Sequence, residues 1–234
     1  MFKLSITGAD NLVLPKTLKS MVEKYPHLEL AILYFPEKEN HNRNPGLLWR
    51  NEFFSMIPKE NTAIHLCGKE VFDIILNENF ELSTLFIELK KTQRIQININ
   101  ARKDIFSITD IQRIYTILLS YGFTLILQYH ERSKEWILPY INETPIENVH
   151  ILLDSSLGKG VAPEKFILPE ELQKLSYPIG FAGGLNPDNI DLIYKQIKLF
   201  NLSDYWLDLE SGCRTNDNFD INKAEQLCAT VFKY

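Results

Sequence analysis

Eight short apolar runs alternate with amphipathic segments along the chain, and this alternation restricts the fold more than any other feature of the sequence. Short apolar runs are typical of strands buried on both faces, whereas apolar residues spaced three and four apart indicate helices packed on one side. The expected strands are 2–7, 28–35, 62–67, 94–100, 123–129, 149–154, 179–182 and 206–209. The expected helices are 14–25, 47–57, 71–76 with 82–89, 105–121, 133–140, 170–175, 188–200 and 221–232.

Strands that alternate with helices pair in parallel through right-handed crossovers. Eight such units in 234 residues predict an α/β fold, a (βα)8 TIM barrel in which residues 1–234 form a single domain. The alternative is an open doubly wound sheet, which needs a glycine-rich turn after the first strand, and residues 5–9 hold only Gly8. The polar stretch 37–45 is expected to form a long loop after the second strand.

Composition excludes several classes of partner. A net charge of −5 and a pI near 5.6 argue against a nucleic-acid partner, which favours a basic face. No segment approaches the ~20 apolar residues of a membrane span, so no membrane partner is expected. Cys67, Cys213 and Cys228 lack the spacing of metal ligands, and their odd number fits reduced thiols. Because the first residues also lack a signal peptide's apolar stretch, we expect a cytoplasmic protein without a bound metal.

Two glycine turns follow the last two expected strands. Gly183 and Gly184 come after the seventh strand, and Asn186 then offers a cap for the next helix. Ser211 and Gly212 come after the eighth. Backbone amides at such turns can hold a phosphate, and barrels of this class place phosphate sites after these two strands. The sequence therefore predicts a site for a small phosphorylated metabolite, although ordinary turns would carry the same glycines.

Candidate acid–base groups stand where other strands end, which is where barrels place their chemistry. Asp154 closes an apolar run, so its carboxyl is a candidate general acid or, equally, a helix cap. His65 and Cys67 are two residues apart on one strand and therefore face the same way. They form either a proton-transfer pair or part of the barrel filling. His130 after the fifth strand fits a solvated loop histidine.

Four motifs in order resemble phosphoribosylanthranilate isomerase, a (βα)8 enzyme of tryptophan biosynthesis. Residues 181–190 resemble that family's seventh-strand phosphate loop, and residues 206–212 resemble its eighth-strand segment. Residues 152–155 with Gly158 and Lys159 are similar to the sixth-strand motif that holds the general acid. Residues 65–68 are similar to its Gln-Leu-His-Gly. The match is good from about residue 149 onward and patchy before it.

The resemblance implies an Amadori rearrangement of N-(5′-phosphoribosyl)anthranilate, without a cofactor, by a monomer or homodimer. It assigns Asp154 as the general acid. Its other implied site residues are Arg43 and Asp208 for the substrate, and Gly183, Gly184, Ser211 and Gly212 for the phosphate.

Departures from the family pattern fall in the first half of the chain. The family opens with Lys-Ile-Cys-Gly, whose cysteine is the general base, and Ser5 is matched to that cysteine here. A serine hydroxyl is too weak a base to replace it unaided, so Cys67 and His65 stand beside Ser5 as candidates. Arg43 matches only loosely the arginine of the second-strand loop. Two alternatives to the isomerase therefore stay open: a related phosphosugar enzyme and a catalytically inactive paralogue.

Overall fold

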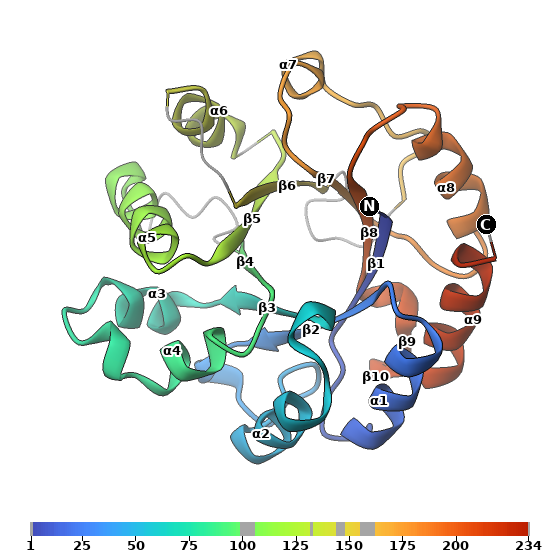
Figure 1. The fold of residues 1–234 in the computed structure, drawn as a ribbon, viewed down its shortest axis with the longest axis horizontal. Coiled ribbons are helices and arrows are strands. Elements are labelled where there is room, and N and C mark those ends of the chain that lie inside the picture. The colour runs from blue at the N-terminus through green and yellow to red at the C-terminus, as the bar shows by residue number, and fades with distance from the viewer. Residues whose placement is uncertain (1, 99–105, 132, 144–147, 155–161, 234) are drawn as a thin grey trace.

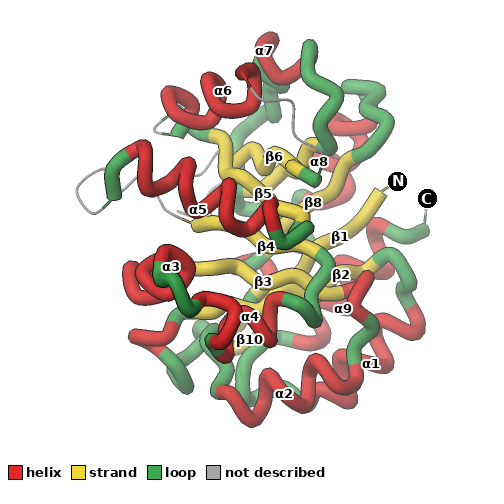
Figure 2. The backbone as a smooth tube through the Cα atoms, turned by 60° about the vertical axis from the view of Figure 1, so that its left-hand side comes forward, coloured by secondary structure: helices red, strands yellow, loops and turns green. Residues whose placement is uncertain are grey.

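The computed structural model describes residues 2–98, 106–131, 133–143, 148–154 and 162–233. Eight parallel strands close into a barrel in chain order, with β8 pairing back onto β1, and helices surround it (Figures 1 and 2). The prediction of a (βα)8 barrel is therefore confirmed. The strands are β1 Phe2–Thr7, β2 Leu28–Tyr34, β3 Thr62–Cys67, β4 Arg94–Asn98, β5 Thr124–Tyr129, β6 Val149–Asp154, β7 Ile179–Ala182 and β8 Tyr205–Leu209.

The helices follow the strands as the alternation predicts. They are α1 Pro15–Lys24, α2 Leu47–Met56, α3 Lys69–Leu76, α4 Thr84–Leu89, α5 Ile108–Ser120, α6 Lys134–Glu143, α7 Glu170–Gln173, α8 Ile190–Lys198 and α9 Ile221–Val231. Local chemistry sets several of their starts, because α5 opens with a capping box between Ser107 and Asp110, and Asp220 caps α9.

Most differences from the expected boundaries amount to one or two residues at element ends. Two ends differ by three residues: α5 begins at Ile108 where 105 was expected, and α6 ends at Glu143 where 140 was expected. Helix α8 begins at Ile190, two residues after the expected 188, with Asn189 at its N-cap. The side chain of Asn186 still accepts hydrogen bonds from the amides of Asp188 and Asn189, so it organises the turn before the helix. The sequence patterns missed the two-residue strands β9 (Arg214–Thr215) and β10 (Asn218–Phe219), which pair after β8. Expected positions 99–100 and 105 lie outside the described residues.

Two packed regions hold the barrel together. The larger apolar core lies between the strands and the helices, and every residue of β2 is buried. A small cluster of Ile126, Leu152 and Trp206 forms a separate core. Because alternate strand residues face opposite sides of a sheet, this cluster marks the inward face, to which Asp154 and Asp208 also belong. The inward-facing side chains near the β8 end are therefore the ones that can form a site.

Candidate active site

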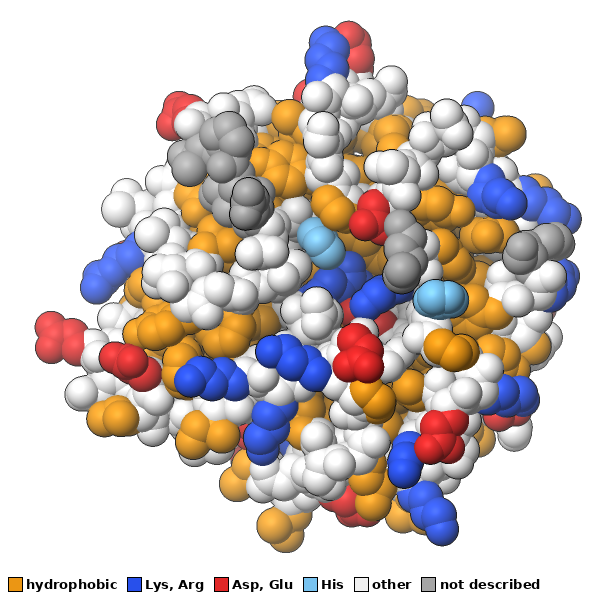
Figure 3. Space-filling model, viewed as in Figure 1, with side chains coloured by type: hydrophobic (Ala, Val, Ile, Leu, Met, Phe, Trp, Pro, Cys, Tyr) orange, Lys and Arg blue, Asp and Glu red, His pale blue; other side chains and the backbone are white. Residues whose placement is uncertain are grey.

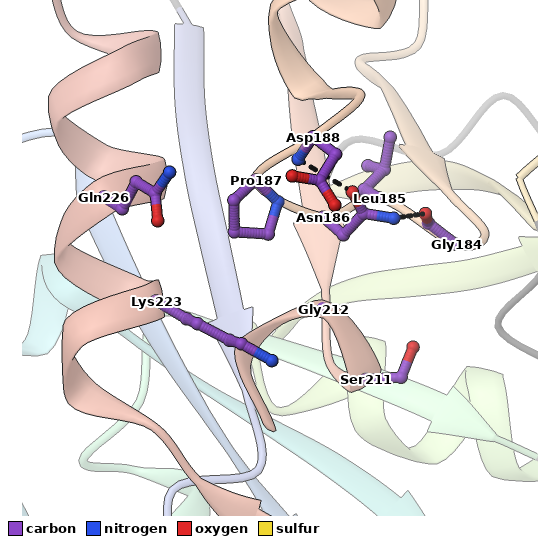
Figure 4. A pocket seen from close by; sticks show the side chains of 9 residues that line it. All are labelled: Gly184, Leu185, Asn186, Pro187, Asp188, Ser211, Gly212, Lys223 and Gln226. Atoms are coloured by element: carbon purple, nitrogen blue, oxygen red, sulfur yellow. Dashed lines mark hydrogen bonds between the residues drawn. The ribbon is translucent and has the colours of Figure 1, made fainter. Parts of the chain in front are cut away.

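The two predicted glycine corners lie against each other at the ends of β7 and β8. A Cβ built on Gly212 would meet the carbonyl oxygen of Leu185 at 1.9 Å, so only glycine permits this contact. Gly183 and Gly184 adopt φ values of 116° and 62°, which favour glycine. Gly184 and Gly212 line a cavity of about 470 Å³ together with Ser211 (Figure 4). Three of the four residues predicted to hold a phosphate therefore line one cavity, and the fourth, Gly183, directly precedes Gly184 but is not part of that lining.

Asparagine side chains fix the first of these corners. The side-chain amides of Asn186 and Asn189 both donate, through Nδ2, to the carbonyl oxygen of Gly184, at 3.2 and 2.9 Å. Asn189 Oδ1 also accepts a hydrogen bond from the backbone amide of Asn186 at 2.9 Å. These bonds hold the Gly184 peptide in one orientation, so the corner is rigid before any ligand arrives.

Five backbone amides of the two corners are available for a ligand. They have no hydrogen-bond acceptor among the described residues, and they belong to Gly183, Gly184, Leu185, Ser211 and Gly212. Backbone N–H groups are strong donors that folded proteins almost always pair. Converging amides at a glycine turn are the usual cradle for a phosphate.

Lys223 is a cationic group of this cavity that the sequence patterns did not single out. It lies in the first turn of α9, three residues after the capping Asp220, and its side chain extends toward the Gly212 corner (Figure 4). Its Nζ donates to the carbonyl oxygen of Arg214 at 2.8 Å. Lys223 is eleven residues after Gly212 in the sequence. The two come close in space because the intervening β9–β10 segment folds back, and sequence patterns do not reveal this.

Asp154, the predicted general acid, is the last residue of β6 and is buried. It lies level with Ala182 of β7, immediately before Gly183, and Ala182 in turn lies level with Asp208 of β8. The acid and the glycine corners therefore belong to three adjacent strand ends. Residues 155–161, which include the Gly158 and Lys159 of the sixth-strand motif, lie outside the described residues.

Ser5, which was matched to the family's cysteine, does not lie at the end of its strand. Ser5 is buried within β1, level with Glu29 of β2 and Asp208 of β8, two residues before the strand ends. The residue that precedes Gly8 at the end of β1 is Thr7, and the family's cysteine also directly precedes a glycine. Thr7 therefore occupies the cysteine's place, and its hydroxyl donates to Asp208 Oδ1 at 3.4 Å.

His65 and Cys67 share the inward face of β3 but fit the role of base poorly. Burial lowers the pKa of His65 to about 3, so its neutral imidazole is a very weak base. Burial, followed by the charge of Glu210, raises the pKa of the Cys67 thiol to about 12, so it carries little thiolate at neutral pH. The side-chain amide of Asn98 donates to Cys67 Sγ at 3.7 Å. Cys67 Sγ donates to the backbone oxygen of His65 at 3.8 Å, and His65 Nε2 has no hydrogen-bond partner among the described residues. A proton-transfer role for the pair stays a prediction.

Arg43 reaches the site from the segment after β2. Its φ of 73° turns the backbone, and its guanidinium binds carboxylates that follow β8. Nη1 lies 2.6 Å from Glu210 Oε1, and Nη2 lies 2.5 Å from Asp217 Oδ1. The loosely matched arginine is therefore close to the end of β8, and its contact with a substrate stays a prediction.

Asp208 of β8 is buried, as Asp154 is. Burial, followed by the charge of Glu29, raises the pKa of its carboxyl to about 7. It is enclosed among other barrel side chains and lies below the glycine corners, which begin three residues later at Ser211. Because Asp208 accepts the hydrogen bond from Thr7, it can hold the ends of β1 and β8 in place.

Two further features were tested on the described part of the chain. Within it, no group of three His, Cys, Asp or Glu side chains is placed to hold a metal ion. No helix in the described ranges has both the length and the apolarity needed to cross a membrane.

Comparison with known proteins gives a family match. The model of the N-(5′phosphoribosyl)anthranilate (PRA) isomerase family matches residues 109–229, which is more than half of the 234-residue chain. A comparison with curated proteins finds no match.

Solved structures share the fold over the full length at low identity. The isomerase from Pyrococcus furiosus is 17% identical, with 100% of both chains covered and a TM-score of 0.55. A structure of monomers of the dimeric enzyme from Thermotoga maritima is 14% identical, with 100% of both chains covered and a TM-score of 0.60. A third, a phosphoribosylanthranilate isomerase in complex with reduced 1-(o-carboxyphenylamino)-1-deoxyribulose 5-phosphate, has the same identity, coverage and TM-score.

The family match spans the strands that carry the acid and both glycine corners, and the barrel closes in the order found in these structures. The chain therefore belongs to the PRA isomerase family.

Proposed function

We propose that this protein converts N-(5′-phosphoribosyl)anthranilate into its 1-deoxyribulose isomer by an Amadori rearrangement, a step of tryptophan biosynthesis. The observation that carries the proposal is the pair of touching glycine corners, whose five amides lack an acceptor among the described residues. They lie beside the strand that ends in Asp154. An anion cradle next to a buried carboxyl suits a substrate that carries a phosphate at one end and a protonatable ring oxygen nearby.

The substrate spans the barrel mouth in this proposal. Its phosphate binds the amides after β7 and β8, and Lys223 adds a positive charge on the far side of the cavity. Its anthranilate carboxylate is directed toward Arg43, whose guanidinium can bind a carboxylate through two parallel hydrogen bonds. A related isomerase is known in complex with a reduced carboxyphenylamino-deoxyribulose phosphate, which carries the same two anionic ends.

Asp154 starts the reaction. Its carboxylic acid protonates the ring oxygen of the ribose, the bond from that oxygen to C1′ breaks, and the nitrogen lone pair forms an iminium. Removal of the C2′ proton then gives an enolamine that relaxes to the ketone. The substrate nitrogen is the electron sink, so the sequence of steps requires no cofactor.

Replacing the acid tests the proposal. The Asp154→Asn variant should lose turnover by about 10²–10⁴-fold, because an amide cannot deliver the proton. It should still bind the phosphorylated product analogue, because the glycine corners are untouched, and a ligand-induced rise in melting temperature measures this binding. Asp73→Asn, on the exposed face of α3, is the matched control and should keep wild-type rates. A wild-type protein without turnover, or an undiminished rate in Asp154→Asn, would contradict the proposal.

A further inference from the structure

The proposed reaction needs a base at C2′, and the family's cysteine is absent from its usual place. Thr7 stands there instead, and its neutral hydroxyl donates to Asp208. His65 and Cys67 are both held in forms that accept a proton poorly at neutral pH. This inference rests on the proposed function and concerns the group that performs this second proton transfer.

Glu210 lies where the missing base would act. The pairing of β1 with β8 ends with Ile6 opposite Leu209, and Thr7 and Glu210 directly follow these two paired residues. A Cβ built on Gly8 would meet Glu210 Cγ at 3.4 Å, which sets the glutamate stem against the end of β1. The neighbouring strand thus supplies a side chain at the position from which a β1 cysteine would reach.

The carboxylate of Glu210 faces the mouth of the barrel. It is about one-third exposed, so both solvent and a ligand can reach it. Besides burial, its negative charge contributes to the raised pKa of Cys67 at the end of β3 and of Asp208 within β8. Arg43 forms an ion pair with Glu210, with Nη1 2.6 Å from Oε1. Arg214 lies near the same place, because its Nη1 is 3.1 Å from the Cβ built on Gly8.

We propose that Glu210 is the catalytic base of this enzyme. In the iminium formed by Asp154, the Glu210 carboxylate takes the proton from C2′. The C2′–H electrons form the C1′=C2′ double bond, and the iminium π electrons return to nitrogen as its lone pair. The enolamine then loses its hydroxyl proton and C1′ gains one, which gives the ketone as an isomer of the substrate.

Arg43 couples binding to this step. In the structure it is shared between Glu210 and Asp217, both on the segment after β8. A substrate carboxylate that binds Arg43 competes with Glu210 for its N–H donors and leaves the glutamate free to accept a proton. The base is therefore held in place before binding and released by the correct substrate.

The test compares three variants with the wild type in steady-state assays across pH. Glu210→Gln keeps the size of the side chain and should lower kcat by about 10²–10⁴-fold. It should not raise KM, because a neutral amide competes less than a carboxylate for Arg43. Glu210→Asp keeps the carboxylate and should retain partial activity with the wild-type acidic limb. Thr7→Cys/Glu210→Ser restores the family's base and should recover turnover above Glu210→Gln, with activity rising at alkaline pH as the thiol ionises.

Asp217→Asn is the control for a purely structural role, because it removes the other carboxylate on Arg43. It should change KM more than kcat and leave the pH profile in place. Equal effects of Asp217→Asn and Glu210→Gln on kcat, or full activity in Glu210→Gln, would overturn the inference while leaving the proposed function standing. A wild-type protein without turnover would remove the proposed function, and this inference with it.

Discussion

Asp208 is a single residue whose ionisation the fold shifts strongly. Burial, followed by the charge of Glu29, raises the pKa of its carboxyl from 3.8 to about 7. Below pH 4 the group is protonated in both the folded and the unfolded chain. Between pH 4 and 7 the folded chain keeps the proton that the unfolded chain releases, so the free energy of unfolding falls as pH rises. Asp208→Asn should therefore be more stable than the wild type at pH 8. The gain is up to about 4 kcal/mol, because each unit of pKa shift corresponds to about 1.36 kcal/mol.

Urea denaturation of Asp208→Asn and wild type at pH 4 and pH 8 checks this. The difference in free energy of unfolding should nearly vanish at pH 4, because the wild-type carboxyl is neutral there. The amide oxygen of Asn can still accept the hydrogen bond from Thr7, so the substitution leaves that contact available. A stability difference that is the same at both pH values would show that Asp208 is ionised normally in the folded protein.

The glycine corners act at the scale of elements, because they join the loop after β7 to the loop after β8. Gly212→Ala would push a methyl group into the carbonyl of Leu185, which lies 1.9 Å from the built Cβ. The two loops would have to separate, at a cost of about 1–3 kcal/mol, and their amides would no longer converge. Calorimetry with inorganic phosphate and with the phosphorylated product analogue should show at least ten-fold weaker binding of both.

Gly122→Ala is the matched control for this substitution. Gly122 also has a positive φ, of 77°, but a Cβ there meets nothing within 4 Å. It should lose about 1–2 kcal/mol of stability from backbone strain and bind phosphate as the wild type does. Unchanged phosphate binding in Gly212→Ala would show that the two corners do not act together.

At the scale of the whole molecule, an ion pair spans the barrel interior. Arg94 of β4 donates to Glu29 of β2 through Nε and Nη2, at 2.8 and 2.6 Å. It also lies 3.2 Å from His150 of β6 and stacks over the Trp206 ring of β8. Charged and polar side chains gather at the centre of the molecule in Figure 3, inside the ring of helices. Four strands of the barrel therefore depend on one guanidinium.

Removing that guanidinium should be costly. Within the described part of the chain, Arg94→Met leaves the buried Glu29 carboxylate with only its longer ion pair to Lys3, at 3.9 Å, so we expect a loss of about 3–5 kcal/mol in urea denaturation at pH 7. Burial raises the pKa of Glu29, but the charge and hydrogen bonds of Arg94 outweigh it, so the net pKa is lowered from 4.5. The stability from the pair is thus present above pH 4.5 and lost as pH falls, and the penalty of Arg94→Met should shrink in acid. The double variant Glu29→Gln/Arg94→Met should recover part of the loss, and no recovery would contradict the argument.

The sequence alone determined the barrel and the glycine corners, because both depend on local patterns. The face that each element buries follows from its apolar pattern. Examples are the apolar run 149–154 and the helical spacing of Ile190, Ile193, Tyr194 and Ile197. Glycines mark turns whose backbone conformation or close contact a residue with a Cβ cannot adopt, and here they are Gly183, Gly184 and Gly212. These signals are read within a few residues, so no tertiary information is needed.

Only the tertiary structure decided which side chains meet at the barrel mouth. It placed Thr7 rather than Ser5 at the end of β1, and it brought Glu210, Arg43 and Lys223 to the site from three separate segments. The register of β1 against β8 and the burial of His65 and Cys67 are set by strands far apart in the sequence. Proximity and pKa depend on such long-range neighbours, so a pattern of residues along one strand cannot supply them.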